Sequence, residues 1–217
     1  MSEMVTNSCT AGCGAACCGS AGSADITGCR FSLYPMCDDF AGIILKSVGK
    51  IDTSKVWAGT DHLSTVYRGR QLHVVDCARA AFLYASKENV HMVGEFTFSR
   101  GCPGDVDADC FLETDDVPCN SALVSVAAAK GDFYAYAKIS FYAFGVTDYM
   151  EHIRFIVELA KERGLKPKSA HYVTLLEGSA AALFAYINEA LGYAYAHLPH
   201  YVLEATLSIN SPSPVKQ

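Results

Sequence analysis

The sequence has little charge, and basic side chains are the scarcer kind. Only 18% of its 217 residues are charged, below the share of about 25% that is typical of soluble domains. The 17 Lys and Arg face 23 Asp and Glu, and no basic run exceeds two residues. A surface that follows a nucleic-acid backbone needs clustered cations, so no nucleic-acid partner is expected. With 51% hydrophobic residues, the composition predicts a well-buried globular chain.

Long apolar segments are also missing. The longest apolar stretches, residues 123–129 and 180–187, are much shorter than the ~20 residues that span a bilayer. No basic segment followed by an apolar one marks a secretory signal. We therefore expect a cytoplasmic protein.

Ten cysteines occur, but none of the familiar cysteine patterns does. There is no Cys-x-x-Cys pair and hence no paired zinc-ligand spacing. Four cysteines crowd the Gly/Ala-rich residues 1–27, which favours low-complexity disorder over a metal or cluster site. Without a secretory signal, the other six are expected to be reduced and to pack as small apolar side chains: Cys29, Cys37, Cys77, Cys102, Cys110 and Cys119.

Sequence motifs of common enzymes are absent as well. There is no G-x-S-x-G elbow, no H-E-x-x-H and neither of the glycine-rich phosphate motifs. His62 and His171 hold related positions but are weak site candidates. The sequence thus predicts no catalytic residue, no metal site and no cofactor.

An internal repeat organises the chain. Four blocks recur in the same order, 108 or 109 residues apart, with one inserted residue near Gly145. The paired blocks are Phe31-Ser-Leu-Tyr34 with Ile139-Ser-Phe-Tyr142, Asp39-Phe40 with Asp148-Tyr149, Thr65-x-x-x-Gly69 with Thr174-x-x-x-Gly178, and Glu95-Phe-Thr-Phe-Ser99 with Glu204-Ala-Thr-Leu-Ser208.

Each copy has the pattern strand, helix, strand, strand, helix, strand. Apolar residues alternate in the outer strands and recur at helical spacing between them. Asp39 and Asp148 are expected to begin the first helix of each copy as N-caps, and Gly164 to end the second of these helices. The sequence therefore predicts an α+β fold of tandem ferredoxin-like repeats with antiparallel sheets. The expected domains are a tail (1–27), a first repeat (28–100), a connector (101–134), a second repeat (135–211) and a short tail (212–217).

An antiparallel sheet with both helices on one side leaves its other face bare. Ser32, Tyr34, Ser140 and Tyr142 are the expected outward residues of the first strands, and they mix polar and aromatic character. Such a face needs a cover. We therefore expect a homodimer, or tight packing between the copies.

Two threonines at matching positions of the repeats are candidate ligand contacts. Thr65 and Thr174 each lie between large apolar neighbours on the same strand face. A hydroxyl there must find a hydrogen-bond partner or cost about 1–3 kcal/mol. That partner is either a cross-strand carbonyl or a bound ligand, and the residues alone leave both open.

Beyond these patterns, the sequence resembles the YkoF family of thiamine- and hydroxymethylpyrimidine-binding proteins. The resemblance covers nearly all of residues 28–211. The segments that carry it are Arg30-Phe-Ser-Leu-Tyr-Pro-Met-x-Asp-Asp39, Asp52-Thr-Ser-Lys-Val-Trp57, Thr60-Asp-His-x-Ser-Thr65, Arg68-Gly69, Phe98-Ser-x-Gly-Cys-Pro-Gly-Asp105 and Asn210-Ser-Pro-Ser.

The resemblance implies a non-catalytic homodimer with one thiamine-type site in each repeat, and a role in vitamin uptake or handling. Carried over by position, the first site uses the strand at Leu33, through its backbone, and the hydroxyl of Thr65. The second uses Phe141 and Thr174. The second copy departs more from the pattern, since Glu177 stands where the first copy has Arg68.

Two other functions stay open at this point. One is a dimeric ferredoxin-like enzyme that acts on a small heterocycle, because this fold hosts many activities. The other is a regulatory partner of a membrane transporter, with residues 101–120 as an exposed docking loop.

Overall fold

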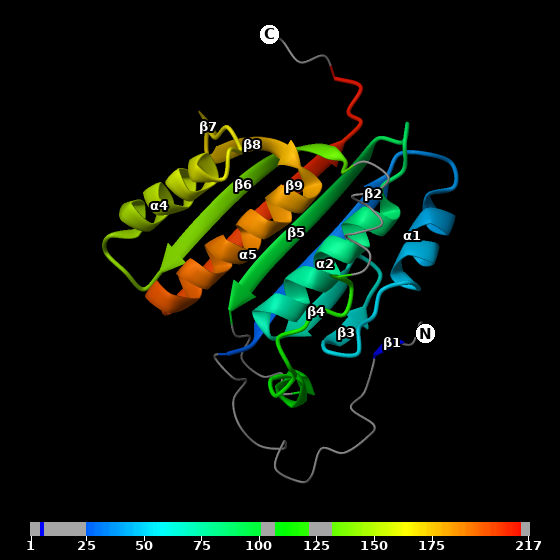
Figure 1. The fold of residues 1–217 in the computed structure, drawn as a ribbon, viewed down its shortest axis with the longest axis horizontal. Helices are drawn as coiled ribbons and strands as arrows, with labels where there is room; N and C mark the ends of the chain where they lie inside the picture. The colour runs from blue at the N-terminus through cyan, green and yellow to red at the C-terminus, as the bar shows by residue number, and fades with distance from the viewer. Residues whose placement is uncertain (1–4, 7–24, 101–106, 122–131, 214–217) are drawn as a thin grey trace.

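One antiparallel sheet of nine strands runs through the chain (Figure 1). The computed structural model describes residues 5–6, 25–100, 107–121 and 132–213. Within them the strand order is β1-β3-β4-β2-β5-β9-β6-β8-β7. The strands are β1 Val5–Thr6, β2 Thr27–Pro35, β3 Trp57–Thr60, β4 Thr65–Gly69, β5 Met92–Arg100, β6 Tyr134–Phe144, β7 Lys168–Ala170, β8 Val173–Ser179 and β9 His200–Ile209.

Helices α1, α2, α4 and α5 of the described residues lie side by side on one face of this sheet (Figure 1). They are α1 Phe40–Val48, α2 Gln71–Ala85, α4 Tyr149–Glu162 and α5 Ala180–His197; a short 3₁₀ helix, η1, spans Asp107–Phe111. Strands β2 to β5 with α1 and α2 follow the βαββαβ order, and β6 to β9 with α4 and α5 repeat it. The predicted tandem of ferredoxin-like repeats is confirmed.

Local sequence explains where these elements begin and end. In β2 every second side chain, from Thr27 to Pro35, is buried against the helices. This alternation is typical of a strand that has one buried face and one solvent-exposed face. Helix α5 begins where Ser179 accepts a hydrogen bond from the Ala182 amide. Helix α4 ends at Glu162 and is followed two residues later by Gly164, whose φ of +71° suits a residue without a side chain.

The two repeats join through their last strands and share one core. Strands β5 and β9 pair antiparallel from Met92↔Ile209 to Ser99↔Val202. Across this seam Phe184 of α5 meets Phe96 edge-on, with ring centroids 5.4 Å apart, and also packs on Phe82 of α2 at 5.9 Å. Rings from both repeats thus pack in one continuous core.

The bare face of the sheet carries the residues predicted for it. Tyr34 is 46% exposed and Tyr142 45%. Each tyrosine donates its hydroxyl to a glutamate on the neighbouring strand, Tyr34 to Glu95 at 3.1 Å and Tyr142 to Glu204 at 3.2 Å. The two contacts are related by the repeat, which shows how closely the copies match.

The connector differs from the exposed loop considered above. Asn120 donates its backbone N–H and its side-chain amide to the buried carboxylate of Asp76, at 2.9 and 3.0 Å. The His73 ring nitrogen Nε2 lies 2.6 Å from the carbonyl of Asp115. The described part of the connector, residues 107–121, is therefore held on the first repeat. The proposed domain boundaries remain a prediction.

Three further expectations need correction or qualification. Asp148 and Asp39 lie at the starts of α4 and α1, but neither side chain accepts a capping hydrogen bond; Asp148 instead lies 3.6 Å from His152. Cys110 is disulfide-bonded, so the expectation that it is reduced is wrong, whereas Cys29, Cys37, Cys77 and Cys119 are free thiols. Within the expected disordered tail, β1 pairs with β3, and residues 1–4 and 7–24 lie outside the described residues.

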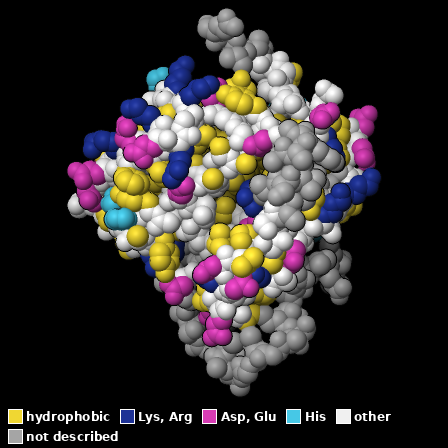
Figure 2. All heavy atoms as spheres, viewed as in Figure 1, with side chains coloured by type: hydrophobic (Ala, Val, Ile, Leu, Met, Phe, Trp, Pro, Cys, Tyr) yellow, Lys and Arg dark blue, Asp and Glu magenta, His cyan; other side chains and the backbone are white. Residues whose placement is uncertain are grey.

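The helix-covered face carries acidic and basic side chains mixed with apolar ones, rather than a field of one sign (Figure 2). Among the described residues, no helix combines the length and the apolar character that a membrane crossing requires.

A buried glycine of β5 tests how tightly the shared core is packed. A methyl group at Gly94 would come within 2.8 Å of both the Phe82 and the Phe96 rings. We expect Gly94→Ala to lower the free energy of unfolding by about 1–3 kcal/mol in urea denaturation, because rigid rings would have to move. In the control Gly28→Ala, the new methyl meets nothing nearer than 3.9 Å and should change stability little. Equal stability of the two variants would show that this core is loosely packed.

Candidate functional site

The two predicted threonines occupy equivalent places in the sheet. Thr65 is the first residue of β4 and lies opposite Phe31, while Thr174 lies near the start of β8 opposite Ile139. Phe31 and Ile139 are themselves equivalent, 108 residues apart. In each repeat the threonine therefore marks the point where the third strand stops pairing with the first.

Beyond Thr65, the first strand runs on without a partner on that side. The Met36 N–H bonds to the carbonyl of His91 next to β5, so the even residues of β2 direct their backbone groups toward β5. The odd residues, Leu33 among them, therefore point toward β4, which begins only at Thr65. No hydrogen bond joins the backbone of Leu33 to residues 61–64, although Ser32 reaches the Leu63 carbonyl through its hydroxyl.

Phe141 in the second repeat has the same arrangement. The Ala180 N–H bonds to the Phe133 carbonyl, which sets the odd residues of β6 toward β8. Pairing of β6 with β8 ends at Ile139↔Thr174, so the backbone of Phe141 points past the end of the ladder, toward Tyr172. We call these two places notches: the first notch is Leu33, Thr65 and Leu63, and the second notch is Phe141, Thr174 and Tyr172.

Each notch leaves a backbone donor and acceptor in a largely buried place. Leu33 is 7% exposed and Phe141 8%. Buried backbone N–H and C=O groups need a hydrogen-bond partner, from protein, water or ligand. A planar ring with a donor beside an acceptor would complete the ladder there.

A cavity of about 240 Å³ opens at the second notch. Apolar side chains of α4 form one wall and the β7–β8 hairpin forms another. The volume lies just below the range of about 300–1,000 Å³ that is typical for drug-sized ligands, which suits a one-ring compound or one end of a longer one. The lining residues that the argument uses are Phe141, Ile153, Val157, Ser169, Tyr172 and Thr174.

Sequence reasoning missed a second hydroxyl in each repeat. Thr60 of β3 lies opposite Thr65, and their side-chain oxygens are 3.0 Å apart. Ser169 of β7 lies opposite Thr174, but no hydrogen bond links Thr174's hydroxyl to another described residue. The available signal was the repeat itself, because Thr60 and Ser169 stand at the same offset of 109 residues.

The notches offer hydrogen bonding and apolar contact rather than metal ligation. No group of three or more His, Cys, Asp and Glu side chains suited to a metal ion occurs in the described parts of the chain. His62 and His171, the weak candidates, lie on the exposed hairpin tips beside Leu63 and Tyr172.

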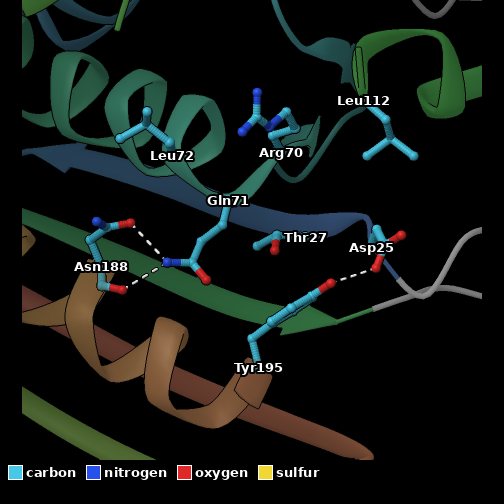
Figure 3. A pocket seen from close by; sticks show the side chains of 8 residues that line it. All are labelled: Asp25, Thr27, Arg70, Gln71, Leu72, Leu112, Asn188 and Tyr195. Atoms are coloured by element: carbon cyan, nitrogen blue, oxygen red, sulfur yellow. Dashed lines mark hydrogen bonds between the residues drawn. The ribbon is translucent and has the colours of Figure 1, made fainter. Parts of the chain in front are cut away.

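A larger cavity, of about 420 Å³, lies between the two repeats (Figure 3). Gln71 of α2 donates to the backbone and side-chain oxygens of Asn188 on α5, at 2.8 and 2.9 Å, and Tyr195 donates to Asp25 at 2.5 Å. Thr27 also lines this cavity. Its side-chain hydroxyl is fully buried and makes no hydrogen bond to a described residue that meets the geometric criteria. It lies close enough to the Tyr201 hydroxyl to lower the pKa of that tyrosine, which burial raises. Because most of its polar groups already bond across the seam, we read this cavity as part of the junction between repeats.

Only one arrangement on the helices resembles a catalytic relay within the described residues. His152 lies 2.9 Å from the Tyr193 hydroxyl through Nδ1 and 3.6 Å from Asp148 through Nε2. However, burial, together with the negative charges of Asp148 and Glu151, raises the pKa of Tyr193. A raised pKa leaves this phenol protonated at neutral pH, which makes it a poorer nucleophile.

The fold and the paired notches define a tandem ferredoxin-like protein with an unpaired strand end in each half and a cavity of about 240 Å³ at the second. A sequence model of the YKOF-related family matches residues 26–105 and 134–214, which are the two repeats. The chain therefore belongs to the YkoF-related family. It is 40% identical over 192 residues to the Bacillus subtilis (strain 168) protein named "Putative HMP/thiamine-binding protein YkoF", an alignment that covers 88% of this chain and 94% of that protein.

The unequal partners of the two threonines predict unequal effects on stability. Thr65→Val removes the bond to Thr60 and should lower the free energy of unfolding by about 0.5–1.5 kcal/mol in urea without ligand. Thr174→Val removes no bond to a described residue and should leave stability almost unchanged. A larger loss from Thr174→Val than from Thr65→Val would contradict the geometry of the second notch.

Proposed function

We propose that the protein binds thiamine or its hydroxymethylpyrimidine precursor without altering it, with one site at each notch. The observation that carries the proposal is the pair of unpartnered backbone edges at Leu33 and Phe141, each beside a threonine. Family membership and the name of the Bacillus subtilis relative support the same ligand class.

The chemistry of an aminopyrimidine fits such a notch. Its ring nitrogen accepts a hydrogen bond and the adjacent amino group donates one, which complements a backbone N–H and C=O that point in the same direction. The threonine hydroxyl supplies one more partner at the end of the ladder. In the second notch, Ile153 and Val157 of α4 would pack against the face of the ring.

We also propose that the protein works in the cytoplasm in uptake or handling of the vitamin, and that association with a membrane transporter is an added role. The described part of the connector does not form a free docking loop, so it gives that association no support. No cofactor is required by a protein that only binds and releases its ligand.

Binding to the two sites should respond separately to the two threonines. We expect calorimetry with hydroxymethylpyrimidine to show two sites per chain. Thr65→Val should weaken one site and Thr174→Val the other, each by about 1–3 kcal/mol, because a buried ligand group loses its partner. The double variant should lose both.

A matched control is Thr97→Val, which removes an exposed threonine hydroxyl from the bare face of the sheet and should bind as the wild type does. If the wild type gives no heat and no thermal shift with either compound at millimolar concentration, the proposed function fails. If it binds and the threonine variants bind equally well, the ligand lies elsewhere.

We further propose that a second copy of the chain covers the bare face of the sheet. Four aromatic side chains of β6 are 42–50% exposed there: Tyr134, Tyr136, Tyr142 and Phe144. Aromatic side chains exposed on one face are common in interfaces between subunits.

Light scattering tests this dimer. The wild type should have the mass of two chains, and Tyr136→Lys should have the mass of one while keeping its fold, because the new lysine lies opposite Glu177. Leu45→Lys, a similar change at an exposed position on the helix-covered side, should leave the dimer intact. A monomeric wild type would refute the dimer but leave the binding proposal standing.

A further inference from the structure

The two notches are bordered by hairpin tips that differ in construction. In the first repeat, Asp61 accepts hydrogen bonds from the amides of Leu63 and Ser64 at 2.8 and 2.9 Å, and pairs with Arg30 at 2.7 Å. The bond from Arg30, followed by those two amides, holds the pKa of Asp61 well below its usual range. The Asp61 carboxylate is therefore ionised at neutral pH and fixes this tip.

The second repeat lacks the carboxylate and the hydroxyl that fix the first tip, although Lys138 stands where the first repeat has Arg30. The positions equivalent to Asp61 and Ser64 carry Ala170 and Val173, which offer no carboxylate and no hydroxyl. These two residues pair with each other, so the tip is a tight turn of only His171 and Tyr172. The second tip is thus a two-residue turn without the hydrogen bonds to the Asp61 side chain that fix the first.

Tyr172 is held in an unfavourable conformation at this turn. Its φ is +71°, a region that glycine and asparagine adopt readily and that bulky residues avoid. It is also 100% exposed, yet it borders the cavity of the second notch. Strain of this kind costs of order 1–3 kcal/mol and persists where the conformation serves a purpose.

The equivalent residue of the first repeat is Leu63, 109 positions earlier and 86% exposed. Both tips therefore present a large apolar side chain beside a notch, but only the second presents an aromatic face. A π face attracts a cation that lies over it, whereas leucine offers no such attraction.

We infer that Tyr172 sets the ligand preference of the second notch, by stacking on the cationic ring of a thiamine-type ligand whose pyrimidine occupies the notch. The second site then prefers the intact cationic vitamin over the neutral hydroxymethylpyrimidine, and the first site, with Leu63, does not discriminate by this charge. This inference rests on the proposed function, because it assigns ligands to the same two notches.

Calorimetry with thiamine and with hydroxymethylpyrimidine, on the full chain, tests the inference. Tyr172→Leu should weaken thiamine at the second site by about fivefold to thirtyfold and leave hydroxymethylpyrimidine unchanged, and Tyr172→Phe should behave as the wild type. The reciprocal variant Leu63→Tyr should tighten thiamine at the first site.

Tyr172→Asn separates ligand preference from folding. Asparagine tolerates a positive φ, so this variant should melt at a higher temperature than the wild type while losing the preference for thiamine. The inference is overturned if Tyr172→Leu weakens both ligands equally or neither. Absence of binding by the wild type is a different result, which overturns the proposed function itself.

Discussion

The antiparallel pairing of β5 with β9 is the constraint on which the rest of the molecule depends. It joins the last strands of both repeats edge to edge through backbone hydrogen bonds, so that the two four-stranded sheets form one continuous sheet. The rings of Phe96 and Phe184 then pack across the seam in a shared core. Strands β2 and β6 lie beside the two seam strands, and each extends beyond the last residue that pairs with β4 or β8.

The proposed function follows from the extension of β2 and β6 beyond their partner strands. The ladder of each repeat stops at a threonine, and the next residue with a backbone donor and acceptor on the same side, Leu33 or Phe141, finds no strand. Where a partner strand ends before its neighbour does, the buried backbone N–H and C=O groups of the longer strand still need hydrogen-bond partners. In the proposed function, a flat heterocycle with a donor beside an acceptor would meet this requirement in the way another strand does.

The repeat and its periodicities were enough to predict the fold and to pair Thr65 with Thr174, because those features depend on order along one chain. Leu33 and Phe141 came from the family resemblance, and all four site residues remain predictions. The two hydroxyls of Thr60 and Ser169 were missed, since a partner on the neighbouring strand is defined by register and not by neighbours in sequence. The same holds for Asn120, which reaches the buried Asp76 across 44 positions. The absence of a cap from Asp148 has a similar origin, because the sequence locates a helix start but not the rotamer of its first side chain.

The structure of a crystal soaked with hydroxymethylpyrimidine tests the central claim most directly. The account predicts a ring in each notch, coplanar with the sheet, with hydrogen bonds to the backbone of Leu33 in one repeat and of Phe141 in the other. A ring bound instead in the cavity between α2 and α5, or on the bare face of the sheet, would contradict it.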